Sequence, residues 1–252
     1  MGEEGQIHIG TSGWSYQHWR GVFYPSDLPS HRWIEFYARH FGTVEINATF
    51  YRLPQAKTFD GWRQKAPPGF LYAVKASRYL THIKRLLDPA APLELLLSRA
   101  RRLGPHLGPI LYQLPPGLGC DVPRLRAFIG ALPRDFHHVF EFRNRSWCTE
   151  EIRWLLAETA MNFCIHDMHG FDCPLWVTGP LAYVRFHGPS AIKYAGRYDL
   201  EHLRLWAERI EAFRRADRDV YAYFNNDVEG HAVTNARELQ ELLGVRPLLA
   251  AE

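Results

Sequence analysis

The chain has 252 residues, of which 46% are hydrophobic, and its net charge at pH 7 is close to balance at +3. Such a chain can bury one large core within a single domain. No apolar run approaches the ~20 residues that a membrane span needs. The acidic N-terminus, MGEEGQIHIG, lacks the apolar segment of a signal peptide. We therefore expect a cytoplasmic protein with no membrane partner.

The basic and sulfur-containing residues narrow the function classes. Arginines outnumber lysines 25 to 5, but this bias alone does not indicate nucleic-acid binding. The cysteines are widely spaced and form no C-x-x-C pair, which predicts free thiols in a reducing cytosol. The cysteine spacing fits a disulfide framework or a zinc site less well. The four cysteines are Cys120, Cys148, Cys164 and Cys173.

Strands are predicted where apolar and polar residues alternate in short runs, and helices where apolar residues recur at helical spacing. The predicted strands are Ile7–Thr11, the start of Thr43–Pro54, Phe70–Ala76, Gly108–Leu114, His137–Phe142, Asn162–Asp167, Leu181–His187 and Asp219–Asn225. The predicted helices are His31–Phe41, Lys57–Ala66, Leu93–Leu103, Pro123–Leu132, Glu150–Ala160, Leu200–Arg215 and Ala232–Leu243.

Eight strands that alternate with helices indicate an α/β fold with parallel strands. Eight such units in about 250 residues are typical of a TIM (β/α)8 barrel. We expect residues 1–252 to form one barrel domain, irregular between strands six and seven, where His169–Gly179 lacks a helical pattern. A doubly wound open sheet is the alternative, but its central strands are usually continuously apolar. The polar alternation here favours the barrel.

In a barrel, alternate residues of each strand point to the centre or to the helices. The more apolar set should face the helices: Val44, Ile46, Phe70, Tyr72, Val74, Phe140, Phe142, Val184, Phe186, Ala222 and Phe224. The complementary inward set is Glu45, Asn47, Lys75, Glu141, Arg143, Arg185, His187, Tyr223 and Asn225. The inward residues lie at or near the C-terminal ends of their strands, where TIM barrels build active sites. We expect a functional polar pocket there.

Four inward residues are candidates for catalysis. Glu45 and Glu141 could form an acid–base pair, as in glycosidases, or could be salt-bridge partners of the nearby cations. Lys75 could be a Schiff-base nucleophile, although a charged lysine in an ion-pair network is the favoured interpretation. His187 could shuttle protons or bind a metal.

A metal site would combine His187 with Glu45, Glu141, His166 and Asp167. No pair of these residues has a diagnostic ligand spacing, so we predict no cofactor and leave a divalent metal as an alternative.

The loops after strands seven and eight form the usual phosphate site of a TIM barrel. Here they are His187–Tyr198, with two glycines, Lys193 and Arg197, and Asn225–Ala236, which leads into a helix N-terminus near Gly230. Free N–H groups at a helix N-terminus favour an anion. We expect a ligand with a phosphate or sulfate group. The predicted binding residues are Trp14, Tyr16, Asn47, Tyr51, Gln113, Arg143, Arg185, Lys193, Tyr223, Asn225, Asn226 and His231.

Several motifs, in order over nearly the whole chain, resemble the YecE-like family, a domain of unknown function. They are Gly10–Trp14 (GTSGW), Val44–Pro54 (VEINATFYRLP), Ala73–Arg78 (AVKASR) with Thr81 and His82, Gln113–Pro116 (QLPP), Phe140–Trp147 (FEFRNRSW), Tyr183–Gly188 (YVRFHG) and Tyr223–Ala236 (YFNNDVEGHAVTNA). The resemblance implies a TIM barrel and no established activity. Ala48 departs from the pattern, which has a small hydroxyl residue at this position.

Three functions remain open. The favoured one is an enzyme acting on a small anionic, phosphorylated or sugar-like molecule, with Glu45 and Glu141 as acid and base, in an isomerase, lyase or hydrolase reaction. The second is a nucleic-acid enzyme or binder. Its stacking residues would be Trp14, Trp19, Tyr51, Tyr79 and Trp147. The third is a non-catalytic binding protein in which Glu45–Lys75 and Glu141–Arg185 are permanent ion pairs.

Overall fold

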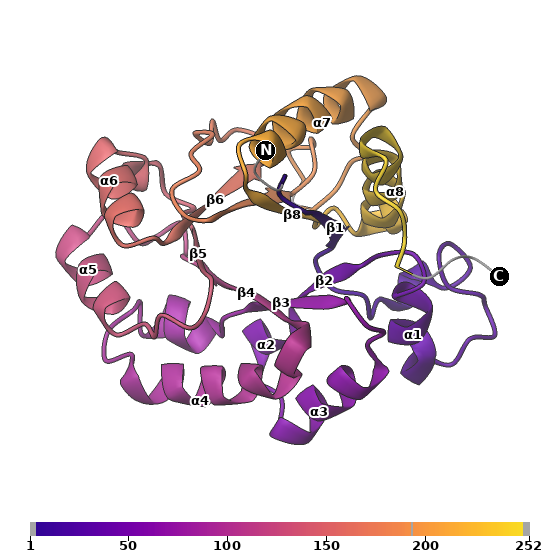
Figure 1. Ribbon diagram of the computed structural model, residues 1–252, viewed down its shortest axis with the longest axis horizontal. Coiled ribbons are helices and arrows are strands. Elements are labelled where there is room, and N and C mark those ends of the chain that lie inside the picture. The colour runs from indigo at the N-terminus through magenta and orange to yellow at the C-terminus, as the bar shows by residue number, and fades with distance from the viewer. Residues whose placement is uncertain (1–3, 193, 249–252) are drawn as a thin grey trace.

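The computed structural model describes residues 4–192 and 194–248. Its eight strands form one sheet in the order β1-β8-β7-β6-β5-β4-β3-β2, and all paired strands are parallel. Figure 1 shows the strands around the centre of the molecule and the helices around the outside. The predicted TIM barrel is confirmed.

All eight predicted strands are present. They are β1 (Ile7–Thr11), β2 (Thr43–Ile46), β3 (Leu71–Lys75), β4 (Leu107–Gln113), β5 (His138–Glu141), β6 (Asn162–Asp167), β7 (Leu181–Phe186) and β8 (Asp219–Phe224). β2 is short, because Asn47 already has helical backbone angles. Asn47 therefore lies just beyond the strand, at its C-terminal end.

The helices are α1 (Trp33–Tyr37), α2 (Ala48–Tyr51), α3 (Ala56–Lys65), α4 (Ala90–Ala100), α5 (Val122–Gly130), α6 (Glu150–Glu158), α7 (Leu200–Arg215) and α8 (His231–Leu243). Shorter helical turns are η1 (Gln17–Trp19), η2 (Ser30–Arg32), η3 (Tyr79–Ile83), η4 (Arg101–His106), η5 (Arg145–Trp147) and η6 (Val228–Gly230). Residues 168–180 are all described and contain no helix, as expected. None of the helices in the described ranges is long and apolar enough to cross a membrane.

Side-chain caps fix where three helices begin. The side chains of Asp121, Thr149 and Asp199 accept hydrogen bonds from backbone N–H groups in the first turns of α5, α6 and α7. Each cap satisfies one N–H group that has no partner within the helix.

The predicted division of strand residues into inward and outward faces is confirmed by two separate apolar layers. The outer layer, between sheet and helices, contains all of the residues predicted to face the helices. The inner layer fills the barrel and includes Ala73, Leu111, Val139, Cys164, Tyr183 and Tyr223. Above this inner layer the barrel becomes polar, and that change in composition creates the site.

In the described part of the chain, the barrel has one seam, between β1 and β2, where no strand ladder forms. The Tyr37 hydroxyl lies in the seam, accepting from the Thr11 N–H at 2.9 Å and donating to the Thr43 carbonyl at 3.1 Å. At the C-terminal end the seam closes, because the Gly13 N–H donates to the Glu45 carbonyl at 2.8 Å. The closed end holds Glu45 beside the loop that follows β1.

Candidate functional site

A buried ion-pair network crosses the barrel below its C-terminal mouth. Arg185 on β7 donates from Nη2 to Glu45 Oε1 on β2 and from Nη1 to Glu141 Oε2 on β5, both at 2.6 Å. All three side chains are 0% exposed. A charge removed from water is stable only when it is paired and hydrogen-bonded. The bidentate fork of the arginine meets that condition for two carboxylates at once.

The remaining carboxylate oxygens also have partners. Glu45 Oε2 accepts from the Tyr183 hydroxyl at 2.7 Å, and Oε1 also accepts from the Ser12 hydroxyl. Glu141 Oε1 lies 2.5 Å from Arg143 Nε. Burial alone would raise the pKa of Glu141, but Arg143 and Arg185 outweigh it and hold that pKa well below its usual range. Glu141 is therefore a fixed negative charge at neutral pH.

The His187 ring is enclosed by the same network. Its Nε2 atom lies 2.7 Å from Arg143 Nη2 and 3.1 Å from Glu141 Oε1, and its Nδ1 atom lies 3.1 Å from the Asn225 side-chain amide. Burial and the adjacent Arg143 charge hold the pKa of His187 well below its usual range. His187 is thus a neutral ring with both nitrogens engaged by protein groups.

Lys75, at the end of β3, differs from the other buried cations. Its side chain is 7% exposed, and Nζ lies 4.3 Å from the centroid of the Phe50 ring. Within residues 4–192 and 194–248 it forms neither a hydrogen bond nor an ion pair through Nζ. Burial and the positive charge of Arg185 lower the pKa of Lys75 to about 7, although Glu45 and Glu141 oppose the shift. The favoured sequence interpretation, an ion-paired lysine, does not match this geometry.

The Lys75 side chain lines a cavity of about 320 Å³, which we call the mouth pocket. This volume lies at the small end of the range for ligand-binding sites. The mouth pocket is lined by Phe50, Tyr51, Lys75, Arg78, His82, Gln113, Pro116, Arg143, Met168 and Tyr194. Of its described lining residues, two arginines and one lysine can carry positive charge, and none is an aspartate or glutamate. The pocket therefore has an electrostatic preference for an anion.

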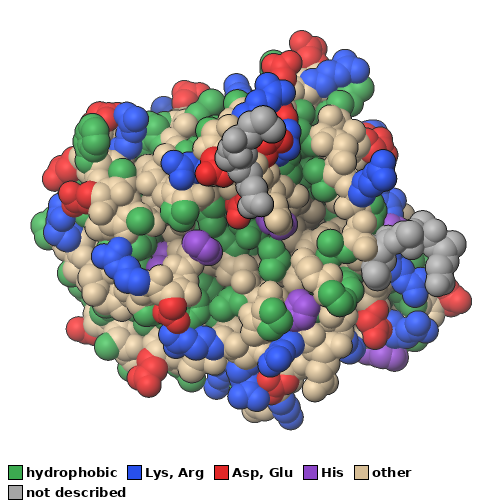
Figure 2. Space-filling view, viewed as in Figure 1, with side chains coloured by type: hydrophobic (Ala, Val, Ile, Leu, Met, Phe, Trp, Pro, Cys, Tyr) green, Lys and Arg blue, Asp and Glu red, His purple; other side chains and the backbone are tan. Residues whose placement is uncertain are grey.

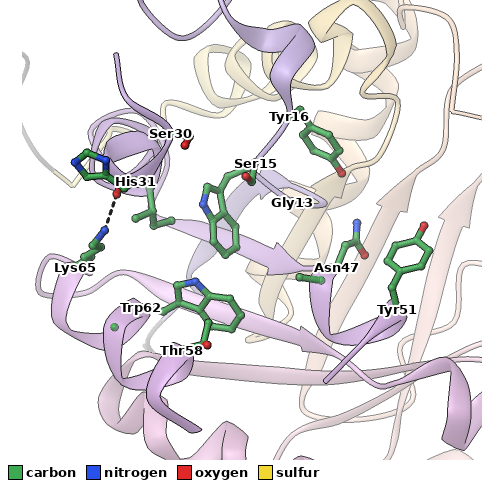
Figure 3. Close-up of a pocket in the computed structure, with 14 residues that line it drawn as sticks. Gly13, Ser15, Tyr16, Ser30, His31, Asn47, Tyr51, Thr58, Trp62 and Lys65 are labelled. Atoms are coloured by element: carbon green, nitrogen blue, oxygen red, sulfur yellow. Dashed lines mark hydrogen bonds between the residues drawn. The ribbon is translucent and has the colours of Figure 1, made fainter. Parts of the chain in front are cut away.

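The structure divides the predicted binding residues between two cavities. Trp14, Tyr16 and Asn47 line a second, more apolar cavity of about 590 Å³, which we call the side pocket, and Tyr51 lines both (Figure 3). Trp14 contacts Trp62 of α3. Their rings meet edge to face, with centroids 5.6 Å apart. One shared pocket for all inward residues, as predicted, is not formed.

Several other predicted residues lie outside both cavities. Tyr223 shares a hydrogen bond of 2.7 Å with Thr43 inside the barrel. The Asn226 amide donates to the Gly196 carbonyl at 2.9 Å and to Asn235 at 3.0 Å, which ties the two expected phosphate loops to each other. His231 begins α8, and Lys193 lies outside the described residues. The described parts of these loops hold each other in place.

Comparisons with known proteins agree with the sequence motifs. Residues 8–251 match the family described as "Protein of unknown function DUF72". The chain belongs to the DUF72 family. Among relatives, the UPF0759 protein YunF of Bacillus subtilis (strain 168) is 26% identical over 95% of each chain. The UPF0759 protein YecE of Escherichia coli (strain K12) is 31% identical over 55% of this chain and 48% of its own length.

Solved structures agree with the DUF72 assignment. A DUF72 family protein of Thermotoga maritima MSB8 is 27% identical and superposes with a TM-score of 0.85, covering 95% of this chain and 99% of the other. A DUF72 family protein of Enterococcus faecalis V583 is 19% identical, with a TM-score of 0.82 over 98% of this chain and 97% of the other. This second likeness shows the fold alone. The predicted YecE-like membership is confirmed. The description of the family names no activity.

Six residues that line the mouth pocket of this DUF72 protein were not among the sequence candidates. They are Phe50, Arg78, His82, Pro116, Met168 and Tyr194. Phe50 lies on α2, and Arg78 and His82 lie at the start and within the turn η3. Both segments directly follow barrel strands, where TIM barrels build their active sites. Their position after β2 and β3 is therefore the sequence feature that could have identified these residues.

The alternative metal site is dispersed. Asp167 accepts from Trp206 Nε1 at 2.7 Å and contacts His202 Nε2 at 2.7 Å, which directs its carboxylate toward α7. His166 Nε2 lies 3.0 Å from the Phe142 carbonyl, and burial lowers the pKa of His166 to about 4. No cluster of three or more His, Cys, Asp or Glu residues suited to a metal ion occurs in the described part of the chain.

Proposed function

We propose that this DUF72 protein is an enzyme that binds a small anionic molecule, phosphorylated or sugar-like, in the mouth pocket. The observation that carries the proposal is the unpaired Lys75 amine in a cavity with cationic and no described acidic lining. In this proposal Lys75 is the acid–base group. Glu45 and Glu141 would position Arg185 and Arg143 instead of exchanging protons with a substrate.

The anion would be held mainly by Arg78. Its side chain is exposed and lines the mouth pocket, and it forms no ion pair within the described ranges. Arg143 supplies a fixed positive edge, because its guanidinium already contacts Glu141 and His187. A free arginine fork matches phosphate and carboxylate geometry well.

Lys75 would act through its neutral amine. With its pKa lowered to about 7, the amine is unprotonated at neutral pH far more often than an ordinary lysine. A general base is most efficient when its pKa lies near the working pH. Proton abstraction from a bound anion is therefore the reaction type that this geometry supports best, and it uses only groups of the chain.

Nucleic-acid binding is less well supported. Several surface arginines face carboxylates, as in the pairs Arg101–Asp135, Arg102–Asp60 and Arg153–Glu150. On the face shown in Figure 2, basic and acidic side chains are interspersed around the rim. A duplex or single strand would require a continuous basic surface. A cytoplasmic location remains part of the proposal, and the four free cysteines are consistent with a reducing compartment.

The test is a thermal-shift titration with inorganic phosphate, sulfate and phosphorylated sugars at low salt. A ligand of the native state raises the free energy of unfolding by RT ln(1 + [L]/Kd). We expect stabilisation of the wild type and at least about a tenfold weaker affinity in Arg78→Met, which loses one charge-assisted contact.

The control is Arg204→Met, which removes an exposed arginine of α7 outside the mouth pocket. Equal anion affinity in both variants would contradict the proposal. Salt-sensitive retention on oligonucleotides, unchanged in Arg78→Met, would favour the nucleic-acid alternative.

A further inference from the structure

We propose that Lys75 Nζ forms an imine with the carbonyl carbon of its substrate, which would be an anionic aldehyde or ketone. This inference rests on the anion site and the neutral Lys75 amine of the proposed function and names the substrate class. In it the amine acts as a nucleophile in place of a general base. An imine-forming lysine needs a lone pair, access to a ligand and no competing acceptor. Each condition has a structural counterpart.

The Lys75 amine has an aromatic ring on one side and is open on another. The Phe50 ring covers one side at 4.3 Å, and the mouth pocket lies on another. Other described lysines lack this environment. Lys84 is paired with Asp88 at 3.2 Å, and Lys65 donates to the His31 carbonyl. Lys57 is exposed to solvent.

The charges around Lys75 also favour the free amine. Arg185 and Arg143 are positive and fixed, and both oppose protonation of Nζ. The nearby carboxylates are committed elsewhere, since Glu45 and Glu141 each pair with Arg185 at 2.6 Å. Arg78 can hold the anionic group of the same molecule, which would place its carbonyl carbon near the amine.

The step balances without an oxidant or reductant. The Nζ lone pair forms a C–N bond while the C=O π pair moves to oxygen. That oxygen takes up one proton, and nitrogen gives up one, which yields a neutral carbinolamine. Loss of the hydroxyl group with the second nitrogen proton releases one water and leaves a C=N bond. Uptake of a solvent proton then gives the iminium ion.

The test uses pyridoxal 5′-phosphate as an anionic aldehyde and pyridoxal as its phosphate-free counterpart. Each is added to the whole protein with sodium borohydride, which reduces the imine to a stable secondary amine. Peptide mass spectrometry then gives the labelling rate of each lysine.

At pH 7 we expect Lys75 to be labelled at least about tenfold faster than the exposed Lys57, because a pKa of about 7 leaves far more free amine than an ordinary lysine has. Labelling of Lys75 should level off above pH 7. In Arg78→Met the advantage of pyridoxal 5′-phosphate over pyridoxal should disappear, while Lys75 remains reactive.

A labelling rate of Lys75 no higher than that of Lys57 would overturn the proposal that Lys75 forms an imine. Inorganic phosphate binding with no preferential labelling would refute the imine and leave the proposed function standing. Absence of both phosphate binding and preferential labelling would refute both. A Lys75→Arg variant that still binds phosphate but loses most of the total label of the wild type would support the imine.

Discussion

Arg185 and Arg126 form ion pairs of similar length in opposite surroundings. Arg185 lies 2.6 Å from Glu45 with both side chains 0% exposed, whereas Arg126 lies 2.8 Å from Glu158 with side chains 60% and 53% exposed. Loss of Arg185 would leave two carboxylates buried without their main partner. Loss of Arg126 would return a carboxylate to water that already solvates it.

We therefore predict that Arg185→Met lowers the free energy of unfolding by about 3–5 kcal/mol, while Arg126→Met lowers it by less than about 1 kcal/mol. Urea denaturation at pH 7 measures both. Similar losses of unfolding free energy in the two variants would show that burial does not make the Arg185 ion pairs more important for stability than the exposed Arg126 pair.

The sequence could predict which charged residues meet, but not how they pair. Strand alternation placed Glu45, Glu141, Lys75 and Arg185 inside the barrel, and the structure agrees. Pairing depends on the reach of each side chain across the barrel, which alternation does not encode. As a result Arg185 takes both carboxylates, and Lys75 is left without one.

Asp167, at the end of β6, attaches α7 to the barrel. Its carboxylate contacts His202 Nε2 and Trp206 Nε1, each at 2.7 Å, and accepts from the Tyr198 hydroxyl at 3.2 Å. The hydrogen bond to Asp167 raises the pKa of His202 above its ordinary value of 6.5. One carboxylate thus receives donors from the first turns of α7 and from the loop before it.

We predict that Asp167→Asn lowers the free energy of unfolding by about 2–3 kcal/mol, since an amide is a weaker acceptor than a carboxylate. The contribution of charged His202 is fully present below pH 6.5 and is lost as the pH rises through its raised folded-state pKa. The deficit should therefore be larger at pH 5.5 than at pH 8.5. Chemical denaturation at both values checks this, with the exposed Asp172→Asn as control. A deficit that grows with pH would contradict the assignment.

Two short elements explain why part of the site escaped prediction. The four residues of α2 and the five of η3 are too few to show a helical repeat in the sequence. They nevertheless carry Phe50 and His82 to the mouth pocket. Longer elements such as α7, whose predicted and observed bounds coincide, show several turns of apolar spacing.

At the scale of the whole barrel, the seam between β1 and β2 depends on close packing at Gly10. A Cβ atom at this position would lie 2.1 Å from the Thr43 carbonyl oxygen, which belongs to the backbone and cannot swing away. Gly61, within α3, offers a matched comparison, because no heavy atom other than its own neighbours lies within 4 Å of an added Cβ.

We predict that Gly10→Ala destabilises the protein by about 2 kcal/mol or more, whereas Gly61→Ala leaves it unchanged or stabilises it by up to ~1 kcal/mol. Thermal unfolding of the two variants compares them directly. Equal melting temperatures would mean that the seam can widen at little cost.

The order of strands around the barrel also sets an order of events during synthesis on the ribosome. Among the described strands, β1 forms a ladder with β8 alone, through register pairs from Ile7–Val220 to Thr11–Phe224. Within the barrel, β1 therefore has no ladder partner until β8 has been translated. Each of the strands from β2 to β7, by contrast, ladders with the next strand in the sequence. The nascent chain can grow as an open sheet from β2 onward, and closure by β1 is a late step of high contact order.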